Sequence, residues 1–262
     1  MLRRRLPRRI VMSGHSKWST IKHKKGKADA ARGAAFSKLI REITTAARIG
    51  GGDVDANPRL RTAVESAKAI NMPADNVDRA IKKGTGELPG VTYEETVYEG
   101  YGPGGVALLI RALTDNKNRS TAEVRHVFDK YGGSMGSAGS VAWQFKPQGL
   151  IVVSKDKSDE DAVLAAALEA GADDVATEAS AFSIVTPLGA LEKVKEQFKD
   201  AGIEWESAEM TMIAANSVKL SERDAPKVLK LIEILEELEE VQQVYANFDI
   251  PDEILEKIAS AD

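Results

Sequence analysis

A strand–helix–strand pattern occurs twice in succession between residues 150 and 213, and it restricts the fold more than any other feature of the sequence. The first copy has a strand at 150–153, a helix that Ser158 caps and Gly171 ends, and a strand at 174–178. The second copy has a strand at 182–185, a helix from Pro187 that Gly202 ends, and a strand at 204–213. Two successive βαβ units predict a ferredoxin-like βαββαβ sandwich, in which an antiparallel sheet carries both helices on one face.

The segments on either side of this duplication are each too short to close a sheet alone. Before it, strands at 93–101 and 106–113 predict a hairpin, and Ser120 with Glu123 predicts a capping box that opens a helix through Tyr131. After it come a strand at 217–220, a helix around 228–238 and a strand at 241–250. We therefore expect one discontinuous α+β domain, residues 86–133 plus 214–262, into which residues 134–213 are inserted after a flexible joint at Gly132–Gly139.

The pattern of residues 28–85 predicts a three-helix domain. Phe36, Leu39, Ile40, Ile43 and Ala47 form one apolar stripe at helical spacing, and a glycine run at 50–52 ends this first helix. Asn57-Pro58 is typical of a helix start, and a third helix follows Pro73 and ends at Gly84. The predicted fold class is α+β: an N-terminal three-helix domain followed by two α+β domains, one of them ferredoxin-like and inserted into the other.

Charge is distributed unevenly along the chain. Residues 1–83 carry 20 Lys/Arg against 7 Asp/Glu, whereas residues 84–262 carry 16 against 33. Residues 13–27 are basic and have too few apolar side chains to form a core, so we expect residues 1–27 to comprise an extension and an extended basic arm. A cationic arm on an acidic body indicates a partner made of phosphates, bound at one end of the molecule.

The candidate nucleic-acid contacts are basic and aromatic residues of the arm and the first helix. Lysine and arginine neutralise phosphates and release condensed counterions, and a tryptophan inside the basic run can stack on a base. The alternative is a solvated tail, with that tryptophan packed on the helical domain. The candidate set is Lys17, Trp18, Lys22, His23, Lys24, Lys25, Lys27, Arg32, Lys38 and Arg41.

A second candidate surface is the polar loop at 114–119, which contains Asn116, Lys117 and Arg119. Backbone N–H groups at the following helix start can hold an anion with two cations beside them. The alternative is a turn whose Asp and Asn side chains cap backbone groups. The nearby run Gly100–Gly105 satisfies G-x-G-x-x-G, but a strand follows it, so we interpret it as a hairpin turn and not as a dinucleotide site.

The sequence offers little for catalysis, and we expect a protein that is not an enzyme. His15, His23 and His126 lack metal-ligand spacing, no nucleophile elbow or P-loop occurs, and we interpret the acidic run 236–240 as a solvated helix end. We expect no metal, no cofactor and no small-molecule substrate. The absence of cysteine, and of any apolar run of about 18–20 residues, predicts a cytoplasmic protein without a membrane span.

Many short motifs, taken together, are specific to one family. They are Gly14-His-Ser-Lys-Trp18, Phe36-Ser-Lys-Leu-Ile-Arg-Glu-Ile43, Asn57-Pro-Arg-Leu-Arg-Thr-Ala63, Asn71-Met-Pro73, Arg79-Ala-Ile-Lys-Lys-Gly84, Tyr98-Glu-Gly-Tyr-Gly-Pro-Gly-Gly105, Thr114-Asp-Asn-Lys-Asn-Arg119, Val124-Arg-His-Val-Phe128 and Val241-Gln-Gln-Val-Tyr-Ala-Asn-Phe248. On these motifs the chain resembles the YebC/PmpR family along nearly its whole length from Met12. Residues 1–11 depart from the pattern, and we expect them to be an upstream extension.

The resemblance implies a three-domain cytoplasmic protein with a helical first domain and two α+β domains. Bacterial members of the family are described as probable transcriptional regulators that bind DNA. The mitochondrial relative is a translational activator for cytochrome c oxidase, and some bacterial members are linked to ribosomes stalled on proline-rich stretches. The family has no settled catalytic residues, and only a contact role is carried over, to Lys17, Lys22, Lys24, Lys25 and Lys27.

Three functional hypotheses follow. The first is a nonenzymatic DNA-binding regulator of transcription, which the family description favours. The second is a factor that binds ribosomal RNA or the ribosome and assists elongation, which an arm suited to shape and charge favours. The third is a ligand-sensing or protein-interaction module built on the βαββαβ domain.

Overall fold

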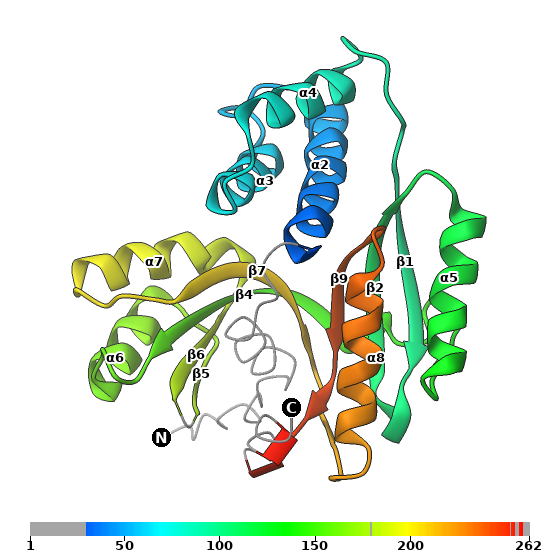
Figure 1. Ribbon diagram of the computed structural model, residues 1–262. Coiled ribbons are helices and arrows are strands. Elements are labelled where there is room, and N and C mark those ends of the chain that lie inside the picture. Colours follow the sequence, from blue (N-terminus) through cyan, green and yellow to red (C-terminus); the bar gives the residue numbers. More distant parts are fainter. Residues whose placement is uncertain (1–29, 179, 252, 255–256, 259–262) are drawn as a thin grey trace. The chain divides into compact units, whose positions relative to one another are not determined.

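The computed structural model describes residues 30–178, 180–251, 253–254 and 257–258 (Figure 1). The described chain divides into two compact units. One contains residues 30–140 and 226–244, and the other contains residues 141–225 together with the described residues from 245 onward. Each unit therefore draws on two separate stretches of the sequence.

Three helices open the first unit and confirm the prediction for this region. They are α2 (Ala30–Gly50), α3 (Pro58–Ala69) and α4 (Ala74–Thr85). Ile43 of α2 and Leu60 of α3 are fully buried in their common core. Gly84 lets α4 cross α2 closely, because a Cβ atom at this position would lie 2.4 Å from the carbonyl oxygen of Thr44.

Asn57 fixes the start of α3, as its position before Pro58 predicts. Its Oδ1 accepts the backbone N–H of Leu60 at 3.1 Å. Its Nδ2 donates to the carbonyl oxygens of Ala46 and Gly51, both at 2.9 Å. The side chain is buried, so one amide joins the end of α2 to the beginning of α3.

Replacement of Asn57 by alanine is expected to lower the free energy of unfolding by about 2 kcal/mol, because it removes a helix cap and two further hydrogen bonds, one buried and one partly buried. Urea denaturation of the full chain measures the change. Glu65→Ala, at an exposed position of the same helix, is the control and should stay within about 0.5 kcal/mol of the parent. A loss for Asn57→Ala no larger than that of the control would contradict the assignment.

A sheet with the strand order β3-β1-β2-β9 completes the first unit. Its strands are β1 (Glu94–Tyr101), β2 (Ala107–Thr114), β3 (Ser134–Met135) and β9 (Val241–Ala246). β1 and β2 are antiparallel and are joined through the short 3-10 helix η1 (Pro103–Gly105), so the G-x-G-x-x-G run lies in a hairpin. Strands from both sides of residues 141–225 thus share one sheet. The exact bounds expected from the sequence, 86–133 plus 214–262 with 134–213 inserted, stay a prediction.

Helices α5 (Lys117–Lys130) and α8 (Ala225–Glu237) contact one face of this sheet. A Cβ atom on Gly100 would lie 2.7 Å from the ring of Phe128 in α5, and one on Gly102 would lie 3.2 Å from Leu231 in α8. Because residues two apart on a strand point to the same face, both helices cover the same side. Figure 1 shows α5 and α8 flanking β1 and β2.

Two predicted helix caps are wrong. Asn116, and not Ser120, caps α5: its side chain accepts the N–H of Arg119, while Ser120 is buried within the helix. Asp159, and not Ser158, caps α6 (Glu160–Ala170) by accepting the N–H of Ala162 at 3.2 Å. Asn and Asp cap as well as Ser, so the sequence offered neighbouring candidates of equal strength.

Two further predictions about the flanking segments are also wrong. The stretch 241–250 is not one strand: it divides into β9 and β10 (Phe248–Asp249), and β10 pairs in parallel with β8 (Val218–Lys219). Asn247 lies between the two strands, and its buried side chain donates to Oε1 of Gln144 at 3.2 Å. The glycine-rich joint is partly ordered as β3, which pairs with β1.

The second unit contains the predicted ferredoxin-like fold. Its elements are β4 (Phe145–Ser154), α6, β5 (Asp174–Thr177), β6 (Ala181–Thr186), a 3-10 helix η3 (Leu188–Ala190), α7 (Leu191–Asp200) and β7 (Ser207–Ala214). The strand order is β5-β6-β4-β7, and all neighbours are antiparallel. This order confirms the βαββαβ sandwich that the duplicated pattern predicted.

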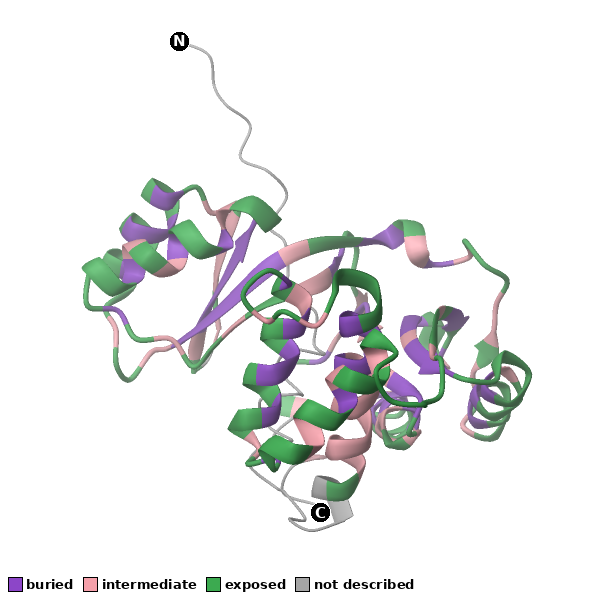
Figure 2. Ribbon diagram, turned by 90° about the horizontal axis from the view of Figure 1, so that it is seen from above, coloured by how far each residue is buried: buried purple, intermediate pink, exposed green. Residues whose placement is uncertain are grey.

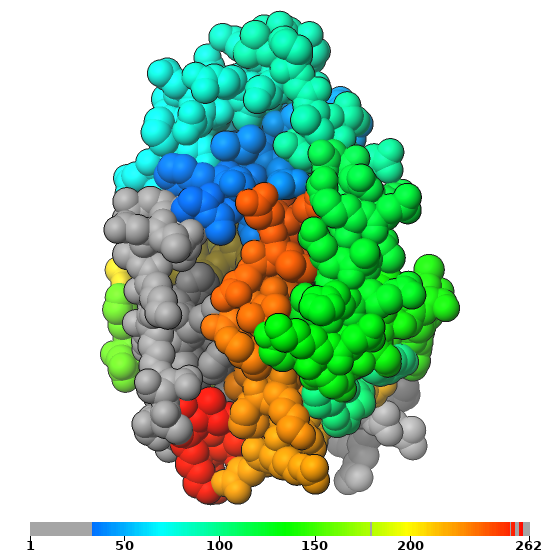
Figure 3. Space-filling view, turned by 45° about the vertical axis from the view of Figure 1, so that its right-hand side comes forward, coloured from blue at the N-terminus to red at the C-terminus, as the bar shows by residue number. Residues whose placement is uncertain are grey.

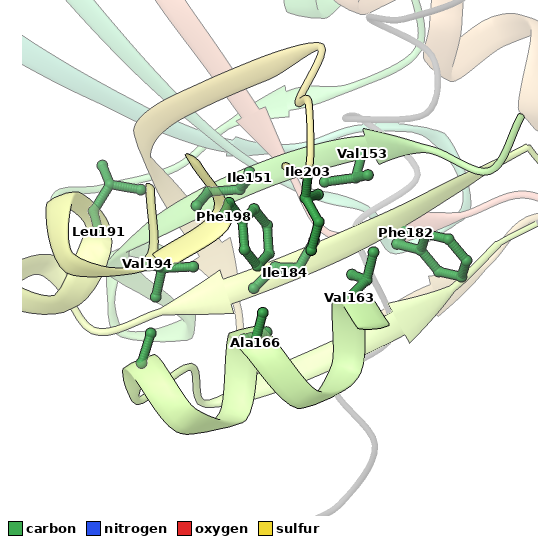
Figure 4. Packing of buried hydrophobic residues seen from close by; sticks show 12 residues of the cluster. Ile151, Val153, Val163, Ala166, Phe182, Ile184, Leu191, Val194, Phe198 and Ile203 are labelled. Atoms are coloured by element: carbon green, nitrogen blue, oxygen red, sulfur yellow. The ribbon is translucent and has the colours of Figure 1, made fainter. Parts of the chain in front are cut away.

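The core of the ferredoxin-like domain lies between its sheet and its two helices (Figure 4). Phe198 of α7 and Val163 of α6 point toward Ile151 and Ile184 on the strands, and all four side chains are fully buried. The outer faces of α6 and α7 are exposed, so buried and exposed residues alternate along both helices (Figure 2). This alternation is the expected signature of helices that cover one face of a sheet.

Candidate nucleic-acid interface

Most of the predicted contact residues lie outside the described part of the chain. They are Lys17, Trp18, Lys22, His23, Lys24, Lys25 and Lys27. Arg32 lies in α2, but its side chain is not among those described. For these positions the contact role remains a prediction.

Lys38 and Arg41 are described, and both make contacts within the first unit. Lys38 Nζ donates to the carbonyl oxygen of Glu236 at 2.5 Å. Arg41 is only 13% exposed, and its Nη2 pairs with Oε2 of Glu239 at 3.0 Å. Its guanidinium also lies over the ring of Tyr93, 5.2 Å from the centroid. These cations tie α2 to the end of α8, where Figure 3 shows the blue atoms of α2 adjoining the orange atoms.

The second predicted surface is a capped turn. Asn116 Oδ1 accepts the N–H of Arg119 at 3.1 Å, so this amide is used as a helix cap. Lys117 pairs with Glu94 at 3.3 Å, and both side chains are more than half exposed. The arrangement matches the alternative considered for this loop, in which its polar side chains satisfy backbone groups.

Arg119 is neutralised by two carboxylates. It pairs with Asp115 at 2.5 Å and contacts Oε1 of Glu240. The hydrogen bond from Arg119 lowers the pKa of Asp115, and the hydrogen bonds to Glu240 and then Asp115 raise the pKa of Arg119. A guanidinium held in this way offers little charge to a further anion.

Glu240 brings the two predicted surfaces together. Arg41 Nη1 lies 3.8 Å from Glu240 Oε1, and Arg119 contacts the same oxygen from α5. The Glu240 side chain is only 6% exposed, so the interpretation of 236–240 as a solvated helix end is wrong for this residue. The sequence of the acidic run could not indicate that Glu240 pairs with two arginines, because Arg119 and Arg41 are 121 and more residues away in the chain.

A second carboxylate, Glu42, joins α2 to α3 and the sheet. Arg59 of α3 donates to it through Nε at 2.7 Å, and Arg111 of β2 donates through Nη2 at 2.8 Å. Glu95 on β1 pairs with the same two arginines, at 3.2 Å and 3.6 Å. The hydrogen bond to Glu42 raises the pKa of Arg59. Two arginines and two carboxylates therefore form one closed network.

The described residues contain no sign of a metal centre or a membrane span. In that part of the chain no group of three or more His, Asp or Glu could hold a metal ion. No helix there is long and apolar enough to cross a bilayer.

Two family models together match most of the chain. One, described as the TACO1/YebC protein N-terminal domain, matches residues 16–87. The other, described as the TACO1/YebC second and third domain, matches residues 93–248. The chain belongs to the TACO1/YebC family. The match to the TACO1/YebC N-terminal domain spans all members of the first candidate set, from Lys17 to Arg41.

TACO1/YebC relatives are similar to the chain over nearly their full length. A protein of Geobacter sulfurreducens is 58% identical over 247 residues, which cover 94% of this chain and 100% of the relative. One from Desulforapulum autotrophicum is 56% identical over 245 residues, which cover 94% and 99%. Both are named probable transcriptional regulatory proteins.

A solved structure has the same fold. The crystal structure of a conserved hypothetical protein from Aquifex aeolicus is 51% identical to the chain and matches it with a TM-score of 0.78, over 91% of this chain and 99% of that one. The similarity confirms the predicted α+β fold class, with its N-terminal helices followed by sheets that carry helices.

Proposed function

We propose that this protein is a nonenzymatic, nucleic-acid-binding regulator that acts in the cytoplasm, with DNA binding that adjusts transcription as the first candidate. The charge of the N-terminal region carries the proposal: residues 1–29 hold ten Lys/Arg and one Asp, in a chain whose remainder is acidic. Such a concentration of cations suits a polyphosphate partner. The names of the relatives as probable transcriptional regulatory proteins support the same class.

The ion pairs of the first unit explain why the proposal assigns binding to the arm. Arg41, Arg59, Arg111 and Arg119 each face at least one carboxylate within 3.3 Å. A phosphate that approached any of them would have to displace that carboxylate first, so little net charge would be gained. We therefore assign the phosphate contacts to Lys17 and the lysines at 22–27.

Binding to ribosomal RNA is the second candidate, and the exposed faces of α3 and α4 favour it. On α3, Glu65 lies between the exposed cations Arg61 and Lys68; on α4, Asp78 pairs with Lys82 at 3.4 Å. No pattern on either helix identifies it as a recognition helix that reads bases in the major groove. Recognition through backbone charge and shape is typical of structured RNA.

The charge-reversal variant Lys22/Lys24/Lys25→Glu is expected to bind nucleic acid more weakly and with a smaller dependence on salt. If about six cations engage phosphates, log K against log[salt] has a slope near −5 for duplex DNA, and removing three contacts brings it to about −2.5. Fluorescence anisotropy with a labelled 20-base-pair duplex, and with a labelled fragment of ribosomal RNA, measures both slopes.

The matched control is Lys193/Lys199/Arg223→Glu, which makes the same change in net charge at exposed positions of the second unit. It should keep the parental slope. Equal slopes for the parent, the arm variant and the control would contradict the proposal. A parent that binds neither nucleic acid at low ionic strength would also contradict it.

Sucrose-gradient fractionation separates the two candidates. Comigration of the parent with ribosomes that is lost in the arm variant supports the RNA candidate. Absence of comigration, together with a footprint on promoter DNA that the arm variant loses, supports the transcriptional one.

A further inference from the structure

The side chain of Trp143 is largely exposed to solvent. It lies in the 3-10 helix η2 (Ala142–Gln144) of the second unit and is 68% exposed, more than any other large hydrophobic side chain in the described residues. Tryptophan carries a large apolar surface and is highly buried on average. An exposure of this size therefore needs a reason.

The backbone around Trp143 is anchored on both sides. Val141 and Phe145 are buried, and Gln144 is 8% exposed. The N–H of Ala215 donates to the Gln144 carbonyl oxygen at 2.7 Å, and Asn247 donates to its side chain at 3.2 Å. The indole is thus presented from a fixed position, and its exposure does not come from a loose loop.

Carboxylates are absent from the two sequence segments that meet at this end of the sheet. The segment 141–225 carries 16 Asp/Glu against 8 Lys/Arg, yet its stretches 141–155 and 210–221 contain no Asp or Glu. These stretches are neighbours, because Phe145 pairs with Ala214 and Lys146 with Ile213. They carry the exposed cations Lys146 and Lys219; Asp249 is opposite Lys219 in the β8–β10 pair.

We propose that Trp143 is a stacking platform for an unpaired base of a nucleic acid, with Lys146, three residues along the chain, to neutralise phosphate. An exposed indole on an anchored backbone, with a cation three residues along a stretch free of carboxylates, resembles the sites that bind single strands, where bases stack on aromatic rings and the backbone follows positive charge. A protein hot spot would instead be centred in an apolar, desolvated patch. Here the nearby positions Lys146, Asn216 and Ser217 are polar and exposed.

This inference rests on the proposed function and makes its partner more specific. Bases inside a duplex are already stacked on their neighbours and cannot lie against a side-chain ring without being flipped out. The platform therefore selects single-stranded or looped segments. It adds a second contact, on the second unit, to the contacts assigned to the basic arm.

Fluorine NMR of the full chain labelled with 5-fluorotryptophan tests the proposal directly. The chain has three tryptophans, so each gives its own signal, assigned through single Trp→Phe variants. Addition of a 12-nucleotide oligouridine is expected to shift the Trp143 signal, whereas a 12-base-pair DNA duplex should leave it in place. In binding assays Trp143→Ala should weaken oligouridine binding on the order of tenfold, and Trp143→Phe should retain most of the affinity.

The two proposals fail in different ways. If Trp143→Ala binds oligouridine as tightly as the parent while Lys22/Lys24/Lys25→Glu loses binding, the stacking platform is wrong and the proposed function stands. If the duplex shifts the Trp143 signal as much as the single strand, selection of unpaired bases is wrong. If the parent binds neither at low salt, both proposals fall. Because residue 143 is exposed, its alanine variant should unfold within about 0.5 kcal/mol of the parent, which checks that any loss is not a folding defect.

Discussion

Phe198→Ala is expected to lower the free energy of unfolding of the ferredoxin-like domain by about 4 kcal/mol, the middle of the range for removing a buried phenylalanine. Phe198 is fully buried between α7 and the sheet, together with Ile184 and Val163. Truncation removes its apolar surface and leaves a cavity that two helices anchored to an antiparallel sheet cannot close. Trp205 packs against the same core, so its fluorescence reports the transition in urea.

The matched control for Phe198→Ala is Glu196→Ala, at an exposed position of the same helix. It should change the free energy of unfolding by less than about 0.5 kcal/mol. Phe198→Leu, which keeps most of the volume, should fall between the two. A loss below about 1 kcal/mol for Phe198→Ala would mean that the core does not depend on this ring.

Glu42→Ala is expected to cost about 3 kcal/mol, because each charged hydrogen bond contributes roughly 1.5–3 kcal/mol and two arginines lose one. The Glu42 side chain is 15% exposed, and its partners Arg59 and Arg111 are about 30% exposed. Both arginines keep a longer contact to Glu95, which prevents a larger loss. Calorimetric unfolding of the full chain measures the effect.

A double-mutant comparison shows whether the charge of Arg111 causes this loss. Arg111→Met introduced into the Glu42→Ala background should recover part of the stability, since it removes a guanidinium left without its main partner. Glu42→Gln keeps the shape and removes the charge, and should cost less than Glu42→Ala. Strict additivity of the two changes, or a Glu42→Ala protein as stable as the parent, would contradict the network.

These networks bear on function because they determine which cations are available. From the sequence, Arg41 and Arg119 belong to two separate candidate surfaces, and both are plausible phosphate contacts. In the structure both reach the buried carboxylate of Glu240. Their charge stabilises the fold of the first unit, and the proposed nucleic-acid contacts fall on the arm and on the Trp143 platform.

Local patterns in the sequence were sufficient for most of the secondary structure. The apolar stripe from Phe36 to Ala47 predicted α2, and Asn57-Pro58 predicted the start of α3. Where two residues that can cap a helix lie close together, as Asn116 and Ser120 do, the sequence pattern does not show which of them is the cap. The break of the last strand at Asn247 was also missed: the Asn247 side chain is hydrogen-bonded to Gln144, 103 residues away, and no local pattern indicates that contact.

The sequence alone determined the α+β class, the βαββαβ duplication and the concentration of positive charge in the first 29 residues, because each of these is a property of neighbouring residues or of composition. Only the tertiary structure decided that Arg41, Arg59, Arg111 and Arg119 are neutralised, that Glu240 is buried and that Trp143 is exposed. Ion pairing and burial depend on distances in space between residues up to 199 positions apart in the chain, as in the pair Arg41–Glu240. No local periodicity or motif encodes such distances.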